Sequence, residues 1–205
     1  MQDLTSLGME NGLLYETIIT TNNDVGEPNA APIGVICKNK MEIVLYLYEG
    51  THTLQNIKLN SHFVVNITKN PLIFVDSTIG DLSSHYFEKY NDSYYIKSAD
   101  SFFTATVKSI KEVEKKDKIG KSRLYIIKAD VKDVIIKEKN FEPLNRAIFA
   151  IIESLVYISR IEMVDETTAQ FYSDRIKEMS RLVNRVGGTD HKESMNRILK
   201  YLENR

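Results

Sequence analysis

The sequence predicts an α+β fold that is mainly β: a β-barrel in residues 1–140, followed by a C-terminal helical bundle in residues 141–205. Two observations predict this order. The first two thirds of the chain contain short runs of β-branched and aromatic residues separated by turn-forming residues. From Asn145 onward, the apolar residues recur at helical spacing instead. With 205 residues, 42% of them hydrophobic, the chain can form one core and a small appended unit.

The first three strands are predicted to form an antiparallel meander. Residues 13–21 and 43–48 are rich in β-branched and aromatic residues, and the apolar run 33–37 places a strand between them. Residues 22–27, Asn-Asn-Asp-Val-Gly-Glu, have the composition of a turn, and residues 39–40 mark a second one.

The middle of the chain is predicted as short alternating elements. Residues 51–60 carry a short helix, and residues 62–68 return as a strand. Residues 72–75 are interpreted as a strand, and residues 82–90 as a short helix. In that helix Asp81 and His85 would share one face, as a solvated pair or, less favoured, as a catalytic pair.

Two long strands, about residues 102–114 and 123–137, are predicted on either side of a charged turn at 117–120. Residues 108–139 contain 11 Lys and Arg against 6 Asp and Glu, so a basic hairpin that touches RNA or DNA is one interpretation. However, acids alternate with the bases, and no aromatic platform for stacking nucleotides is interleaved. We therefore expect a solvated hairpin and no nucleic-acid partner.

Three helices are predicted in the last third of the chain. The first carries the apolar residues Ile148, Ile151, Ile152, Leu155 and Ile158. Asp165 is the predicted N-cap of a second helix that runs to about Val186 and is stopped by two glycines. Asp190 and Glu193 have the spacing of a capping box for a final helix.

Global properties favour a cytoplasmic protein without a membrane segment. The N-terminus lacks a basic start and an apolar run, so no signal peptide is expected. The most hydrophobic helix, residues 147–161, is too short and too charged to span a bilayer. The formal net charge of −1 indicates neither nucleic acid nor anionic lipid as a partner. The single cysteine, Cys37, is interpreted as a strand residue rather than a nucleophile.

The run Asn-Ala-Ala-Pro-Ile-Gly at residues 29–34 is the first candidate binding segment. Proline removes a hydrogen-bond donor from a strand, and glycine permits the close approach of a ligand or another backbone. The small side chains of Ala30 and Ala31 leave space over the strand, so a flat ring could lie there. An edge strand with a bulge is the alternative interpretation.

The second candidate segment is residues 49–57, between a strand and a helix. Thr51 and Thr53 both fall near the predicted helix start, where unpaired N–H groups and the positive end of the helix dipole suit a phosphate. A threonine N-cap alone is the alternative, although it would need only one of the two threonines.

Taken together, these segments resemble a known family. The sequence resembles the flavin-reductase-like branch of the FMN-binding split β-barrels in the order of its motifs. These are the 29–34 strand, then Thr53, Asn56 and Ile57, and then Phe-Val-Val-Asn at 63–66. The resemblance covers about residues 13–137. With its helical tail, the chain looks like an uncharacterised archaeal family of such proteins.

The resemblance implies a cofactor, FMN, and a set of ligands. Its phosphate would be held by Thr51, Thr53 and Asn56, with His52 contributing through its backbone or ring. The isoalloxazine ring would lie along Asn29, Ala30, Ala31, Pro32 and Ile33. Members of this fold usually form homodimers with the flavin near the interface, so a homodimer is expected. The sequence departs from many flavin reductases because its phosphate segment has no arginine or lysine before Lys58.

Other chemistries find little support in the sequence. The histidines at 52, 62, 85 and 191 show no metal-binding spacing, so no metal is expected. Motifs for a Rossmann domain, a P-loop and a serine hydrolase are absent from the sequence. The sequence thus predicts an FMN-binding protein, expected to be an oxidoreductase that acts on a small-molecule redox substrate. A deazaflavin binder and a non-catalytic flavin-binding or scaffold module are the alternatives; the electron donor and acceptor leave no trace in the sequence.

Overall fold

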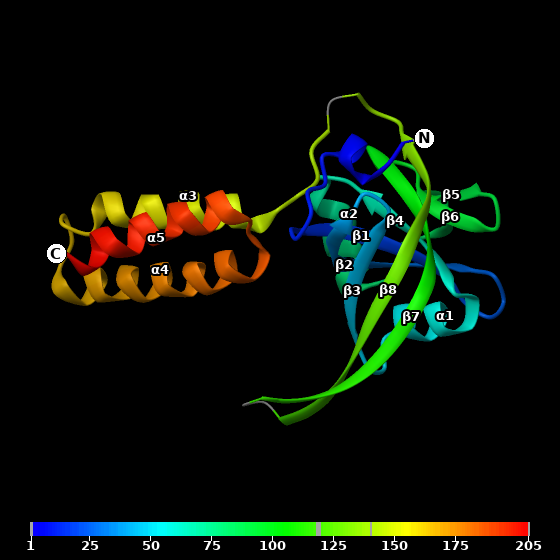
Figure 1. Ribbon diagram of the computed structural model, residues 1–205, viewed down its shortest axis with the longest axis horizontal. Helices are drawn as coiled ribbons and strands as arrows, with labels where there is room; N and C mark the ends of the chain where they lie inside the picture. Colours follow the sequence, from blue (N-terminus) through cyan, green and yellow to red (C-terminus); the bar gives the residue numbers. More distant parts are fainter. Residues whose placement is uncertain (1, 118–119, 140, 205) are drawn as a thin grey trace. The chain divides into compact units, whose positions relative to one another are not determined.

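The computed structural model describes residues 2–117, 120–139 and 141–204 of the chain (Figure 1). The chain divides into two compact units, Met1–Leu144 and Asn145–Arg205. The first unit contains all the strands of the described residues, and the second contains three helices. The predicted α+β fold, a barrel followed by a helical bundle, is confirmed.

Six antiparallel strands close the barrel in the order β1-β2-β3-β8-β7-β4. Buried side chains such as Ile19, Leu45 and Phe63 fill its interior and form the main core. The strands are β1 (Leu14–Asn22), β2 (Pro28–Asn39), β3 (Glu42–Tyr48), β4 (His62–Ile67), β7 (Ser101–Asp117) and β8 (Gly120–Ile136).

The predicted meander of three strands is present as β1, β2 and β3. The turn between β1 and β2 is fixed by Asn23, whose Oδ1 accepts hydrogen bonds from the N–H groups of Val25 and Glu27 at 3.1 and 2.8 Å. Gly26 takes the positive φ of 83° that this turn requires. The turn therefore forms for the reason that its composition indicated.

Strand β2 is paired unevenly along its length. Its residues 28–36 pair with β1, whereas its pairing with β3 begins only at Val35. Among the described strands, residues 28–34 therefore have a neighbour on one side only. Pro32 lies within this segment, where a missing N–H group is tolerated.

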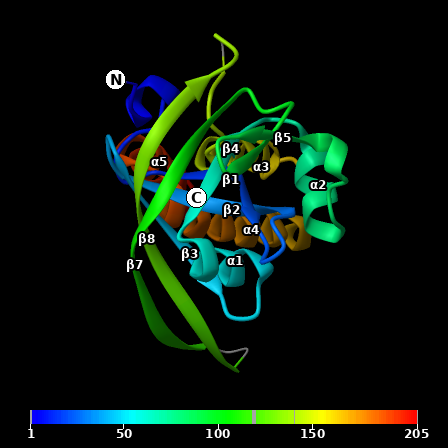
Figure 2. The same cartoon turned by 90° about the vertical axis from the view of Figure 1, so that its right-hand side faces the viewer.

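Two α-helices lie in the described part of the barrel unit. Helix α1 (His52–Asn60) confirms the predicted short helix. Helix α2 (Pro71–Ile79) occupies the segment that was predicted as a strand at residues 72–75, so that prediction was wrong. Asn70 caps α2 by accepting from the Leu72 N–H group at 3.0 Å, and Pro71 stands in its first turn. Figure 2 shows α2 on one flank of the barrel and α1 below β2.

The helix predicted at residues 82–90 is also absent, and a small sheet occupies its place. A 3₁₀ turn, η2 (Ser84–Tyr86), leads into β5 (Phe87–Tyr90), which pairs with β6 (Ser93–Ile96). A second 3₁₀ turn, η1 (Leu4–Leu7), lies near the N-terminus. Tertiary pairing between β5 and β6 prevails over the local pattern that had suggested a helix.

The two predicted long strands are present as β7 and β8. Beyond the segments that pair with β4 and β3, they continue as a hairpin whose strands pair only with each other (Figure 1). Residues 118 and 119, in the predicted charged turn, lie outside the described residues.

The helical unit contains α3 (Arg146–Arg160), α4 (Glu166–Val186) and α5 (Thr189–Glu203). Asp165 caps α4 as predicted, accepting from the Thr168 N–H group at 3.0 Å. The predicted capping box of Asp190 and Glu193 was wrong, because α5 begins two residues earlier, with Gly188 in place of Asp190 as its N-cap. The ring of His191 accepts from the Gly188 N–H group instead. Among the described helices, none is long and apolar enough to cross a membrane.

Candidate functional site

A pocket of about 730 Å³ opens on the barrel unit between α1, the β1–β2 turn and the loop that follows α2. This volume suits a small organic ligand or a cofactor. Its lining residues are Asn23, Asp24, Glu27, Pro28, Asn29, Ala30, His52, Gln55, Asn56, Leu59, Asp81, Leu82, Ser84 and Phe87.

One face of α1 forms a wall of the pocket. The lining residues His52, Gln55, Asn56 and Leu59 follow the i, i+3, i+4, i+7 spacing of a single helical face. Leu54 and Ile57 on other positions of the helix are buried in the barrel core. Burial of these apolar residues therefore fixes which face α1 turns toward the pocket.

Asn56 anchors this helix to the barrel. Its side-chain Nδ2 donates to Oγ1 of Thr21 on β1 at 3.0 Å, and Asn56 is only 8% exposed. Among the hydrogen bonds of the described residues, none ends on Asn56 Oδ1. This carbonyl oxygen in the pocket wall is thus an acceptor that a ligand could satisfy.

The start of α1 offers hydrogen-bond donors. Thr51 is the N-cap: its Oγ1 accepts from the Leu54 N–H group, and its carbonyl accepts from the Gln55 N–H group at 3.2 Å. The first-turn N–H groups of His52 and Thr53 then have no acceptor within the helix. Together with the positive end of the helix dipole, they form a site where an anion is stabilised.

The predicted ring-binding residues all lie on β2, but only two of them line the pocket. Asn29 and Ala30 are in its wall, whereas Ala31, Pro32 and Ile33 follow along the strand outside the lining. The Ile33 carbonyl accepts from Oγ1 of Thr17 at 2.9 Å, and its side chain packs against the barrel core.

The predicted phosphate residues are likewise divided. His52 and Asn56 line the pocket, whereas Thr51 caps the helix and Thr53 is buried, with 2% of its surface exposed. The hydroxyl of Thr51 also donates to the Tyr48 carbonyl at 3.1 Å. The structure therefore brings four predicted residues together at one pocket: Asn29, Ala30, His52 and Asn56.

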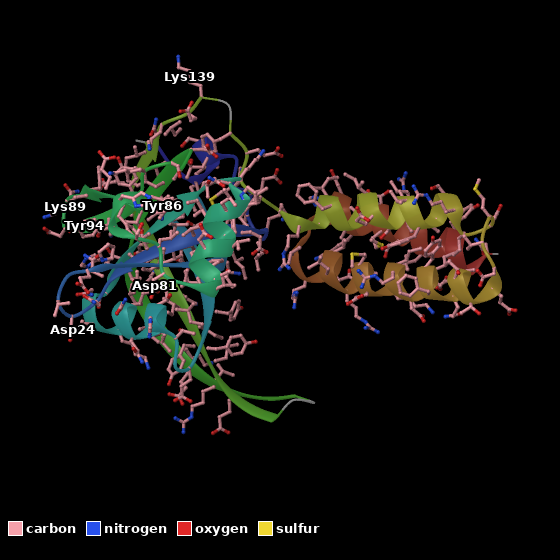
Figure 3. The ribbon with its side chains drawn as sticks, turned by 180° about the vertical axis from the view of Figure 1, so that it is seen from behind. Asp24, Asp81, Tyr86, Lys89, Tyr94 and Lys139 are labelled. Atoms are coloured by element: carbon pink, nitrogen blue, oxygen red, sulfur yellow. The ribbon has the colours of Figure 1, made fainter. Side chains whose placement is uncertain are left out.

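The charges of the pocket wall are mostly negative. Asp24, Glu27 and Asp81 contribute carboxylates, and no lysine or arginine is among the described residues of the lining. Figure 3 labels Asp24 and Asp81 on the barrel unit. Lys58, the nearest cation in the sequence, lies over the ring of Tyr125 on β8, with its Nζ 3.8 Å from the ring centre.

Several lining residues were missed by the sequence analysis. Gln55 and Leu59 could have been found, because they share the helical face of His52 and Asn56. Leu82, Ser84 and Phe87 carried no such signal, because tertiary structure brings the loop after α2 and the start of β5 to the pocket. The proposed pair of Asp81 and His85 lacks its helix, and only Asp81 lines the pocket.

Other candidate groups lie elsewhere. Cys37 is buried in β2, and burial raises the pKa of its thiol, so it is not an activated nucleophile. Within the described part of the chain, no cluster of three or more His, Cys, Asp or Glu residues could hold a metal ion.

Comparison with known families gives matches over both units. The family described as protein of unknown function (DUF447) N-terminal domain matches residues 15–138, and that described as protein of unknown function (DUF447) matches residues 145–200. An uncharacterised protein of Methanocaldococcus jannaschii is 29% identical over 196 residues, covering 93% of this chain and 98% of that protein.

Two solved structures are similar to this chain. The crystal structure of an FMN-bound DUF447 protein from Methanosarcina mazei is 26% identical, has a TM-score of 0.55, and covers 97% of this chain and 99% of its own. Nitrilotriacetate monooxygenase component B from Bacillus cereus is 15% identical, with a TM-score of 0.50 over 63% of this chain and 73% of its own. The second likeness concerns the fold alone.

Proposed function

This chain belongs to the DUF447 family, and on that premise we propose that it is a flavoprotein that binds FMN in the pocket beside α1. One observation carries the proposal. Four residues expected to contact FMN, on segments more than twenty residues apart in the sequence, meet at a single pocket: Asn29, Ala30, His52 and Asn56. The FMN-bound relative from Methanosarcina mazei, similar along its whole length, supports the choice of cofactor.

The residues of the pocket fit the three parts of FMN. The N–H groups of His52 and Thr53 at the start of α1 would hold the phosphate. Asn56 Oδ1 would accept from a hydroxyl of the ribityl chain, because a carbonyl oxygen cannot donate to a phosphate. Among the described strands, the segment of β2 that begins at Asn29 has a pairing partner on one side only, so the backbone of its other edge would meet the ring.

The assignment changes the expected role of Thr51 and Asn56. Thr51 would act through the helix cap, since its hydroxyl already bonds the Leu54 N–H group and the Tyr48 carbonyl. Asn56 would position α1 through its bond to Thr21 while it contacts the ligand. The phosphate would be bound by backbone dipoles rather than by a lysine or arginine side chain of this lining, which implies moderate affinity.

Bound FMN would supply two-electron redox chemistry, so we propose an oxidoreductase that acts on a small-molecule substrate. The chain's part is to bind and orient the cofactor and to shape access to it. No general acid or base is required of the protein for hydride transfer to a flavin.

We also propose a homodimer with the flavin near its interface. Leu72, Val75 and Ile79 form one face of α2 and are 66%, 49% and 81% exposed. Such an apolar face on a helix is typical of a surface that another chain covers. Helix α2 packs on β2, and its Ile73 shares a buried cluster with Ala30 of the pocket wall. A partner on α2 would therefore lie beside the ring-binding segment.

The visible spectrum of the purified protein, with mass analysis of the released ligand, tests the proposal. Oxidised FMN absorbs in the blue, whereas a deazaflavin peaks at shorter wavelength, so the spectrum separates these two cofactors. Steady-state oxidation of a reductant with FMN bound then separates an oxidoreductase from a flavin-storing or scaffold module. Colourless protein that also fails to bind added FMN would contradict the proposal.

A further inference from the structure

Helix α3 carries an apolar stripe that the helical unit leaves exposed. Ile148, Ile152 and Leu155 are 45%, 49% and 50% exposed, and Phe149 beside them is 54% exposed. The residues that α3 buries within the helical unit lie on a different face of the helix: Ala147, Ala150, Ile151 and Ser154. The packing of the helical unit therefore does not account for the four large apolar side chains of the stripe.

The spacing of the stripe is that of a seam between two helices. Ile148, Ile152, Leu155 and Ser159 follow one another at intervals of four, three and four residues, which is the a/d pattern of a coiled coil. The hydroxyl of Ser159 donates to the Val156 carbonyl at 2.9 Å, so its donor is already satisfied. A helix with this pattern on its exposed side packs well against a second helix with the same pattern.

The charged residues of α3 lie outside this seam. Arg146, Glu153 and Arg160 recur at intervals of seven residues, so all three occupy the b position of the pattern. Between Ile148 and Ser159, no charged residue stands at an a or d position. Pairing along the seam would therefore bury apolar surface without burying an unpaired charge.

The proposed homodimer needs more apolar surface than α2 offers. Leu72, Val75 and Ile79 are together exposed by about two whole side chains, or about 400 Å², at about 200 Å² for each large side chain. Each partner of a stable interface contributes about 800 Å². The α2 face therefore provides about half of the required area. By the same measure the α3 stripe exposes another 400 Å² or about that, so the two faces together reach the standard size.

We propose that the α3 stripe packs against the α3 stripe of a second copy of this chain, in the same dimer that covers α2. The inference rests on the homodimer proposed above and names its second contact surface. A two-fold interface joins identical patches, so the second copy supplies a helix that carries the matching a/d pattern. Because each face alone is too small, loss of either face should separate the two copies.

Ile152→Glu tests this contact, because it places a charge at the centre of the seam. Sedimentation equilibrium gives the dissociation constant of the dimer, and we expect it to rise at least about thirtyfold, since both copies lose an apolar contact. Asn196→Glu, at an exposed position of α5, is the control and should leave the constant unchanged. Ile152 is half exposed within the chain, so the variant should keep the helical content of the parent by circular dichroism.

Cysteine cross-linking identifies the surface that α3 contacts. The natural Cys37 is buried, so a cysteine introduced by Ile152→Cys is the accessible thiol. At low protein concentration, a short bismaleimide should link the Ile152→Cys protein into covalent dimers and leave the Asn196→Cys protein monomeric. If α3 contacted a different surface of the second copy, the two introduced thiols would be too far apart to be linked.

The outcomes separate this inference from the proposed function. Unchanged dimerisation of the Ile152→Glu protein, or a dimer that Ile152→Cys does not cross-link, overturns the α3 pairing and leaves the homodimer and the flavin site standing. A dimer that is lost in Ile152→Glu but kept in Val75→Arg supports the α3 pairing and overturns the α2 face. A parent protein that is monomeric at all concentrations overturns the α3 pairing and the homodimer, whereas FMN binding is measured separately by the visible spectrum.

Discussion

Asn56 on helix α1 donates a hydrogen bond to Oγ1 of Thr21 on strand β1 at 3.0 Å, and both residues are buried. The bond joins the helix that forms one wall of the pocket to a barrel strand. It also orients the Asn56 side chain, so that Nδ2 faces β1 and Oδ1 remains for a ligand. The position of the pocket wall thus depends on a polar contact within the protein.

Replacing Thr21 by valine should destabilise the protein. The substitution keeps the shape of the side chain but leaves Asn56 Nδ2 without its acceptor, which costs about 1–3 kcal/mol in a buried setting. Urea denaturation should show a lower midpoint with an unchanged slope. Thr21→Ser, which keeps the hydroxyl, is the control. A Thr21→Val protein as stable as the parent would contradict the anchoring role of this bond.

Replacing Thr51 by alanine should lower the free energy of unfolding by about 1 kcal/mol, because the N-cap of α1 is lost. Thr51→Ser should retain most of the stability. The measurement is again the urea midpoint of each variant. Loss of stability in the alanine variant alone identifies a cap. Equal stability of the two variants would mean that the Thr51 hydroxyl does not stabilise the helix as a cap, and would favour its originally predicted role as a direct phosphate ligand.

Much of the fold could be predicted from the sequence, because many of its strands, turns and helix caps depend on residues that are close to one another in the chain. The turn at Asn23 and the cap at Asp165 formed as predicted, since each bonds N–H groups two to four residues away. The apolar residues 72–75 were assigned to a strand because a short apolar run fits a strand and a helix alike. Asn70, followed by proline at the first helical position, was the local signal that identifies a helix.

The site was only partly predictable, because distant segments complete it. Asp81 reaches the pocket through the loop after α2, and no spacing in the sequence foretold that contact. Asn66, part of the motif that carried the family resemblance, has a structural role. It is fully buried, donates to the Ile18 carbonyl at 2.9 Å and accepts from the Ile96 N–H group at 2.7 Å. It therefore joins β4 to β1 and β6.

Stability should fall at high pH partly through Tyr95. Burial, with Glu88 as a further cause, raises the pKa of Tyr95 to about 12 from an ordinary 10.0. The folded protein then keeps a proton that the unfolded chain releases, so the free energy of unfolding declines as pH rises from about 10 to about 12. Tyr95→Phe preserves the stacking on Phe102 and removes this titration.

Urea midpoints at about pH 9 and about pH 11.5 measure the effect of Tyr95. Between these two values, we expect the Tyr95→Phe protein to lose less stability than the parent. An equal loss in both proteins would mean that Tyr95 titrates normally.

The proposed homodimer should depend on the apolar face of α2. Val75→Arg places a charge between Leu72 and Ile79, and we expect it to yield monomers. Light scattering coupled to size exclusion gives the molar mass. Lys89→Glu, at an exposed position of β5, is the control and should remain dimeric. A parent protein that is monomeric at all concentrations would contradict the dimer.

Titration of the apoprotein into FMN, followed by flavin fluorescence, tests the pocket as the FMN site most directly. We predict saturable quenching with one FMN bound per chain, and at least about tenfold weaker binding for Gln55→Trp, whose indole would fill the pocket from the exposed face of α1. Lys192→Trp on α5, outside the pocket, should bind FMN as the parent does. Unchanged fluorescence with excess parent protein, or equal affinity of the Gln55→Trp variant, would contradict FMN binding at this pocket.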